Sequence, residues 1–292
     1  MKNTKKIAFT VLTTIGMGLA FTQVVQADSA PGDVVVSLGK DLTPVQKNSL
    51  LEKMNVPKNA ILIDVTNAEE DKYLGKLLPK TTIGTRAISS VKITIGNPDT
   101  GIKVHADNIN WVTEDMYKNA MITAGVKDAS VEVMAPFSVS GTAALTGIFK
   151  AYEKTTDVKI TEDQKEVANE ELVKTAKLGD SIGSEKAVEF MELAKAALAE
   201  KNPENKAEIE AIVDNAATET GVQLTKEESE GVVTLLDNMK NAGVDFQHIK
   251  EGLSVAKEKV NAIINSEETK NIIQKLGDLF KAVVDAIKSW FN

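Results

Sequence analysis

Hydrophobic and polar positions alternate in two different ways along the chain. In the first half, short apolar runs that suit strands are separated by amphipathic stretches that suit helices. The expected strands cover residues 34–38, 61–65, 87–95, 102–105 and 129–135. After residue 160, apolar side chains recur every three or four positions, which is the spacing of helices. The pattern predicts an α+β or α/β fold, with an N-terminal mixed sheet and packed helices followed by an all-helical C-terminal region.

Several expected helices carry the same local start signal. Thr43, Thr66, Thr161 and Thr225 are each followed three residues later by Gln or Glu, which is the pattern of a capping box. We therefore expect helices to begin at these four threonines. The remaining expected helices begin near residues 113, 143, 185, 203, 246 and 271, and the one from residue 246 is expected to run unbroken to residue 263.

Turn residues set the expected connections in the first half. The segment 97–101 (NPDTG) predicts a turn that joins strands 87–95 and 102–105 into a hairpin. Pro136 is expected to end the last strand, because proline cannot donate to the ladder. Ser140, Gly141 and Thr142 are expected to supply a turn and the N-cap of a helix over residues 143–154.

The N-terminus has the pattern of a secretory signal peptide. Lys2, Lys5 and Lys6 precede an apolar run over residues 7–21, and Ala27 supplies a small residue before a cleavage site. This run is shorter than the roughly 20 apolar residues that span a bilayer, so an uncleaved anchor is the weaker alternative. We expect residues 1–27 to be removed, no transmembrane helix afterwards, and a secreted or envelope-associated protein on the extracellular side.

Charge separates the two parts of the mature chain, which we expect to be an α/β domain over residues 28–153 and an acidic helical region over 154–292. Residues 28–150 carry 13 basic and 14 acidic side chains, whereas residues 151–292 carry 18 basic and 28 acidic side chains. Such an acidic chain is a poor partner for nucleic acid. It contains no cysteine, which excludes disulfides, thiol catalysis and cysteine-ligated metals.

A set of short motifs gives the sequence a specific resemblance. These motifs are SLGKDLT (37–43), VTNAEE (65–70), YLG (73–75), IGTRAISSV (83–91), NIN (108–110), MYKNA (116–120), TAGV (123–126) and SGTAALTG (140–147). Together they resemble the YpuA-like family of exported Gram-positive proteins, which carry domain of unknown function 1002. The resemblance implies export and a shared domain without an established activity, and it supplies no catalytic residues.

The residues themselves offer three candidate sites, none strong enough to assign catalytic, cofactor or metal residues. Ser138, Ser140, Gly141 and Thr142 form a candidate anion or ligand loop at a helix start, although small residues there also let a helix pack closely on a sheet. A hydrolytic relay would need His105 and Asp107 to meet Ser89, Ser90, Ser138 or Ser140. A hard-cation site would use Asp64, Glu69 and Glu70, although acids in a first helical turn also favour the helix dipole.

These observations favour a non-enzymatic binding or scaffold protein of the envelope, with an envelope protein or a wall polymer as partner and no cofactor. The alternative is an envelope hydrolase or metal-dependent enzyme that uses groups near His105 and the 138–142 loop. A further alternative concerns the amphipathic segment 271–291, which could pack on its own chain, on a partner or on a membrane surface. Its candidate interaction surface is Phe280, Trp290 and Phe291.

Overall fold

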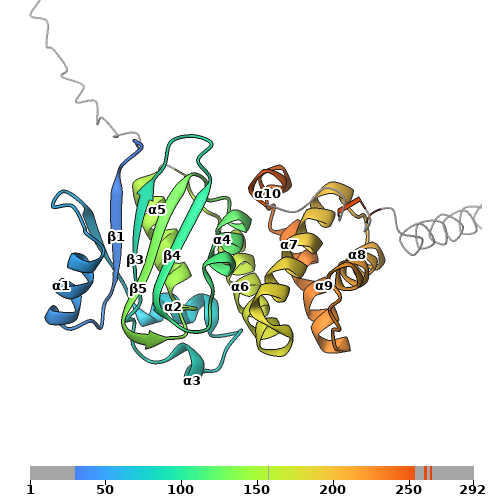
Figure 1. The fold of residues 1–292 in the computed structure, drawn as a ribbon, viewed down its shortest axis with the longest axis horizontal. Coiled ribbons are helices and arrows are strands. Elements are labelled where there is room, and N and C mark those ends of the chain that lie inside the picture. The colour runs from blue at the N-terminus through green and yellow to red at the C-terminus, as the bar shows by residue number, and fades with distance from the viewer. Residues whose placement is uncertain (1–29, 157, 254–259, 262–263, 265–292) are drawn as a thin grey trace, which may run out of the picture.

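A computed structural model describes residues 30–156, 158–253, 260–261 and 264 (Figure 1). The strands are β1 (Val34–Gly39), β2 (Ile61–Val65), β3 (Ser90–Ile95), β4 (Ile102–Ile109) and β5 (Ala129–Val139). The helices in the sheet half are α1 (Pro44–Lys53), α2 (Asn67–Leu74), α3 (Lys80–Ile83), α4 (Glu114–Thr123) and α5 (Ala144–Thr155). The helices that follow are α6 (Glu162–Ile182), α7 (Ser184–Lys201), α8 (Lys206–Thr220), α9 (Lys226–Asn241) and α10 (Phe246–Gly252).

The predicted fold class is confirmed. The strands form one mixed sheet in the order β2-β1-β3-β5-β4, with β1–β2 and β4–β5 parallel and the two central pairs antiparallel. After residue 160 the described residues contain helices and no strand. The expected signal peptide (1–27) and the amphipathic segment with Phe280, Trp290 and Phe291 lie outside the described residues.

The predicted hairpin between β3 and β4 is wrong, because β5 lies between the two strands. The loop that connects them crosses the start of β5 and is fixed there by Asp128. The Gly96 amide donates to the Asp128 backbone oxygen at 2.6 Å, and the Gly101 amide donates to Asp128 Oδ1 at 2.9 Å. A loop of this length can reach over one strand, so the more completely buried β5 takes the central position and β4 lies at the edge.

Pro136 does not end β5, as the sequence predicted, but lies inside an irregular part of it. The register with β4 shifts between Asp107 and Ile109, and Asn108 between them has φ 60°. Asn108 Nδ2 donates to the Ala135 oxygen at 2.8 Å and so replaces ladder bonds at this point. Proline is tolerated because a bulge needs no amide donor, and the strand continues to Val139.

The four predicted capping boxes are confirmed. Thr43, Thr66, Thr161 and Thr225 each accept from the amide three residues later, and the Gln or Glu at that position accepts from the threonine amide. The expected cap of α5 is wrong: the N-cap is Ala143, without a side-chain hydrogen bond. The 140–142 turn is held by tertiary contacts instead.

Helices cover both faces of the sheet, as Figure 1 shows. Alternate strand residues point to opposite sides, so Val35 packs with α4 and α5 whereas Val36 and Leu38 pack with α1. Gly147 lets α5 approach β1 closely, because a Cβ there would lie 2.6 Å from Ser37 Oγ. Small residues in this stretch therefore serve helix–sheet packing, one of the two roles expected from the sequence.

Helix α6 connects the sheet half to the helical half. Ala168, Leu172 and Ala176 belong to the core under the sheet, whereas Val167 and Leu178 belong to the second core among α7, α8 and α9. The helix predicted from residue 246 is shorter than expected. α10 ends at Gly252 and Leu253 is extended, so a continuous helix from residue 246 to residue 263 is wrong.

Candidate functional site

The predicted ligand loop is only partly gathered at one place. Ser140 and Gly141 line a hollow of about 380 Å³ near α3, together with Ser89. Thr142 is buried at 1 % exposure, and Ser138 is exposed but does not line this hollow. Two of the four predicted loop residues therefore face a ligand-sized space.

Gly141 is required for the shape of this loop. Its φ of 91° favours glycine, and a Cβ would lie 2.4 Å from both Ile109 Cγ2 and the Tyr117 hydroxyl. That hydroxyl donates to the Gly141 oxygen at 2.5 Å. Full burial raises the pKa of Tyr117, so this side chain is a neutral donor that fixes the loop on α4.

The lining of this hollow combines hydroxyl groups with one guanidinium and one exposed ring. Thr82, Thr85 and Ser89 supply hydroxyl groups, and Phe137 is 47 % exposed. Arg86 is the single charged residue among the lining residues. Its Nη2 donates to the Asp41 backbone oxygen at 3.3 Å.

A second hollow of about 640 Å³ shares Thr82 and Ser140 with the first, so the two hollows adjoin at these residues. Trp111 lies along the second part, and its Nε1 donates to both carboxylate oxygens of Asp180 at 2.9 and 3.1 Å. Lys177 also lines it and donates to the Leu77 oxygen at 3.0 Å. We call the two hollows together the Arg86–Trp111 groove.

A buried acid supports one side of this groove. Asn67 Nδ2 lies 3.3 Å from Glu70 Oε2 and 3.4 Å from the Gly84 oxygen, and Gly84 lines the groove. Glu70 is 1 % exposed, and burial raises its pKa to about 7. The carboxyl group therefore titrates near neutral pH directly behind the loop that carries Arg86.

The two histidines do not meet the candidate serines. His105 Nδ1 lies 3.0 Å from Glu114 Oε1, and the same oxygen accepts from the Ala106 amide at 2.9 Å. His105 thus pairs with an acid of α4 instead of Asp107, and it lines neither hollow of the Arg86–Trp111 groove. No hydrogen bond joins either histidine to a serine in the described part of the chain.

The three acids considered for a hard cation are held by other groups. Asp64 lies 2.6 Å from Lys40 Nζ, and Lys150 Nζ lies 2.5 Å from Glu69. Lys40 holds the pKa of the Asp64 carboxyl below its usual range, which keeps the pair ionised. Within the described ranges, no group of three or more acids, histidines or cysteines has the spacing of a metal site.

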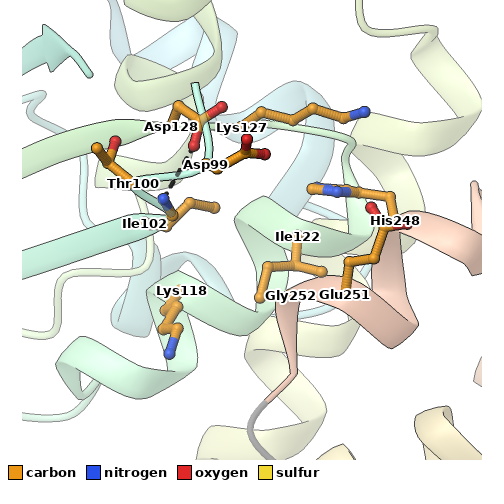
Figure 2. A pocket seen from close by; sticks show the side chains of 11 residues that line it. Asp99, Thr100, Ile102, Lys118, Ile122, Lys127, Asp128, His248, Glu251 and Gly252 are labelled. Carbon is orange, nitrogen blue, oxygen red and sulfur yellow. Dashed lines mark hydrogen bonds between the residues drawn. The ribbon is translucent and has the colours of Figure 1, made fainter. Parts of the chain in front are cut away.

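Another hollow, of about 450 Å³, lies between the β3–β4 loop, α4 and α10 (Figure 2). His248 is 8 % exposed there, and its Nε2 donates to the Val126 oxygen at 2.9 Å. The charged residues of its lining have both signs: Asp99, Lys118, Lys127, Asp128 and Glu251. It lacks the combination of exposed ring, hydroxyl groups and single charge found in the Arg86–Trp111 groove.

Sequence reasoning missed Arg86, Trp111, Phe137 and Thr82, because they come from separate segments that only the fold brings together. The signal that the sequence did offer for two of these residues is the rarity of their residue types. Arg86 is the only arginine in the chain, and Trp111 is one of two tryptophans. The chain has 33 lysines, and a planar guanidinium offers a fork of donors that a lysine does not.

Comparison with known proteins places this fold in a family. The sequence profile described as "Protein of unknown function (DUF1002)" matches residues 38–256. The chain therefore belongs to the DUF1002 family, in agreement with the resemblance seen in its motifs. It is 48 % identical over 289 residues to a protein of Bacillus subtilis (strain 168) named "Uncharacterized protein YpuA", an alignment that covers 99 % of this chain and 100 % of that protein. No solved structure matches the chain.

None of the helices in the described ranges combines the length and the hydropathy needed to span a bilayer.

Proposed function

We propose that this protein is an exported binding protein of the cell envelope and that its ligand is an extended wall polymer held in the Arg86–Trp111 groove. The observation that carries the proposal is that the two hollows adjoin at Thr82 and Ser140. Two adjoining hollows can take successive units of a chain-like ligand. The volume of each hollow is in the range of ordinary ligand sites.

The chemistry of the groove also supports a sugar chain. Trp111 and Phe137 lie in different parts of the groove and offer apolar ring faces, which suit the apolar faces of sugar rings. Hydroxyl groups of Thr82, Ser89 and Ser140 lie along the same path and can donate to or accept from sugar hydroxyls. The bond from Trp111 to Asp180 holds one ring in place before any ligand binds.

Co-sedimentation with purified cell walls tests this proposal. The chain from residue 28 to residue 292 should sediment with walls of Bacillus subtilis, and Phe137→Ala should weaken this binding by about 10-fold, equivalent to ~1.4 kcal/mol. Val158→Ala is a matched control, because Val158 is also about half exposed, at 48 %, but lies outside the groove. The proposal fails if the native chain does not sediment or if both variants behave alike.

Fluorescence provides a second measurement on the same site. A Trp290→Phe variant leaves Trp111 as the only tryptophan, so its emission reports on the groove alone. Soluble wall fragments should shift this emission with the same affinity that sedimentation gives. Unchanged emission at saturating fragments would place binding elsewhere on the protein.

Export is tested separately. N-terminal sequencing of the protein recovered outside producing cells should begin at Asp28 or within a few residues of it. A mature chain that retains Met1 would contradict the proposal of export.

A further inference from the structure

The charge of the Arg86–Trp111 groove differs from that of the chain as a whole. The chain has 42 acidic and 34 basic residues, yet Arg86 is the only charged residue that lines the first hollow. In the second hollow, Lys177 and Asp180 carry opposite charges and together add no net charge. The lining of the groove therefore carries one positive charge in excess, which is that of Arg86.

Most of the hydrogen-bonding capacity of Arg86 is open to solvent. The side chain is exposed, and its one hydrogen bond to a described residue is the 3.3 Å bond from Nη2 to the Asp41 oxygen. Among the described residues no carboxylate forms an ion pair with it. A guanidinium has five donors in a planar fork, which matches the two oxygens of a carboxylate or phosphate.

The backbone that carries Arg86 is held on both sides. The Ala87 amide donates to Asp41 Oδ2 at 2.8 Å, and the Gly84 oxygen lies 3.4 Å from Asn67 Nδ2. The side chain thus extends from a fixed segment at the margin of the groove, with Ser89 and Ser140 on the same lining. Such a fixed base reduces the ordering cost of binding.

We infer that the groove takes an anionic wall polymer and that Arg86 binds the carboxylate or phosphate carried on one of its units. This inference rests on the proposed binding function and adds to it the charge of the ligand and the residue that selects it. The aromatic rings would hold the sugar, whereas the guanidinium would distinguish a charged unit from a neutral one. A lysine at this position would keep the charge but lose the two-point contact.

The experiment compares three wall preparations and three variants. The walls are intact, extracted to remove their phosphate polymer, or extracted and then amidated to neutralise the carboxylates as well. The variants are Arg86→Gln, Arg86→Lys and Lys80→Gln. Lys80 is a matched control because it lies in adjacent α3, is 78 % exposed and does not line the groove. Thermal unfolding of each variant checks that the fold is unchanged.

We expect Arg86→Gln to weaken binding to the anionic wall by about 10-fold, equivalent to ~1.4 kcal/mol, and Arg86→Lys to fall between it and the native chain. Lys80→Gln should stay within about 2-fold, as expected for a screened surface charge. The native chain should bind amidated walls as weakly as Arg86→Gln does. Loss of binding on phosphate extraction would identify a phosphate, and loss only on amidation would identify a carboxylate.

Two results would overturn the inference in distinguishable ways. If Arg86→Gln binds all preparations like the native chain while Phe137→Ala remains weak, the groove binds a neutral sugar chain and only the role of Arg86 falls. If the native chain binds none of the three preparations, the proposed function falls together with this inference.

Discussion

Helix α6 joins the two halves of the molecule through two contacts. Each contact contains a Lys–Glu ion pair, which is buried in one and exposed in the other. On one side, Glu171 of α6 and Lys195 of α7 form an ion pair at 2.5 Å, with side chains 1 % and 0 % exposed. Thr123 of α4 donates to Glu171 at 2.5 Å, and Lys195 donates to the Asn119 oxygen at 3.2 Å. This contact has charge at its centre.

The other contact, between α6 and α2, is arranged in the opposite way. Its centre is apolar, with Leu74, Leu78 and Val173 in one cluster. Its ion pair, between Glu162 and Lys72, lies at the margin with both side chains 54 % exposed. An apolar centre tolerates small shifts, whereas a buried ion pair requires matched positions on three helices. The α4–α6–α7 contact therefore specifies the register of the two halves, and the α2–α6 contact mainly adds buried apolar area.

Removal of one partner of the buried pair should have the largest effect. Lys195→Met leaves Glu171 buried without a cation, and we expect a loss of about 3–5 kcal/mol in the free energy of unfolding. Burial already raises the pKa of Glu171, so the variant should carry this carboxyl in its neutral form. Urea unfolding measures the loss. Lys186→Met, at an exposed position of the same helix, should change stability by no more than about 0.5 kcal/mol.

Replacement of both partners tests whether the pair provides specificity or stability. The double variant Lys195→Met and Glu171→Leu should recover to within about 1–2 kcal/mol of the native chain, because no buried charge remains. If the double variant is as unstable as Lys195→Met alone, the loss reflects poor packing. The claim that the buried pair provides specificity instead of stability would then be wrong.

Glu70 of α2 gives a third environment, in which a buried acid forms no ion pair with any residue that the structure describes. Its pKa is raised from 4.5 to about 7, so its contribution to stability is present below pH 4.5 and lost as pH rises through 7. The shift corresponds to about 3 kcal/mol. Glu70→Gln should therefore be more stable than the native chain at pH 8 and similar to it at pH 4.5, measured by urea unfolding at both values. Glu52→Gln, at an exposed position of α1, should show the native dependence on pH.

The exposed pair should have the smallest effect. Lys72 lowers the pKa of Glu162 to about 2, so any stabilisation is present above pH 4.5 and lost as pH falls towards 2. Solvent screens this pair, and Glu162→Gln should cost less than about 1 kcal/mol at neutral pH. If Glu162→Gln lowered the free energy of unfolding more than Lys195→Met does, the exposed pair would contribute more to stability than the buried one, against this prediction.

Local features of the fold were predictable from the sequence, and features that depend on distant segments were not. The capping boxes at Thr43, Thr66, Thr161 and Thr225 need only residues three positions apart, and they form as predicted. The place of β5 between β3 and β4 depends on which strand is buried most completely, so the local turn signal at 97–101 gave the wrong pairing.

The same distinction holds for the candidate site. Ser140 and Gly141 were found because a turn before a helix has a local signature, whereas Arg86 and Trp111 reach the groove from distant segments. Glu171 lies four residues after Val167 and three after Ala168, so helical spacing places it on the apolar face of α6, unlike Glu170. Its partner Lys195 lies in α7, and only the packing of the helices brings the two together.

The insertion of β5 between β3 and β4 has a consequence for the order of folding events. β3 and β4 are close in sequence, but each completes its pairing only with a strand that begins at Ala129. The fast local step that hairpins provide, on the order of microseconds, is therefore not available to this part of the sheet. A chain synthesised from its N-terminus holds two incomplete strand edges until α4 and β5 have emerged, and the high sequence separation of these contacts predicts slow folding of the sheet.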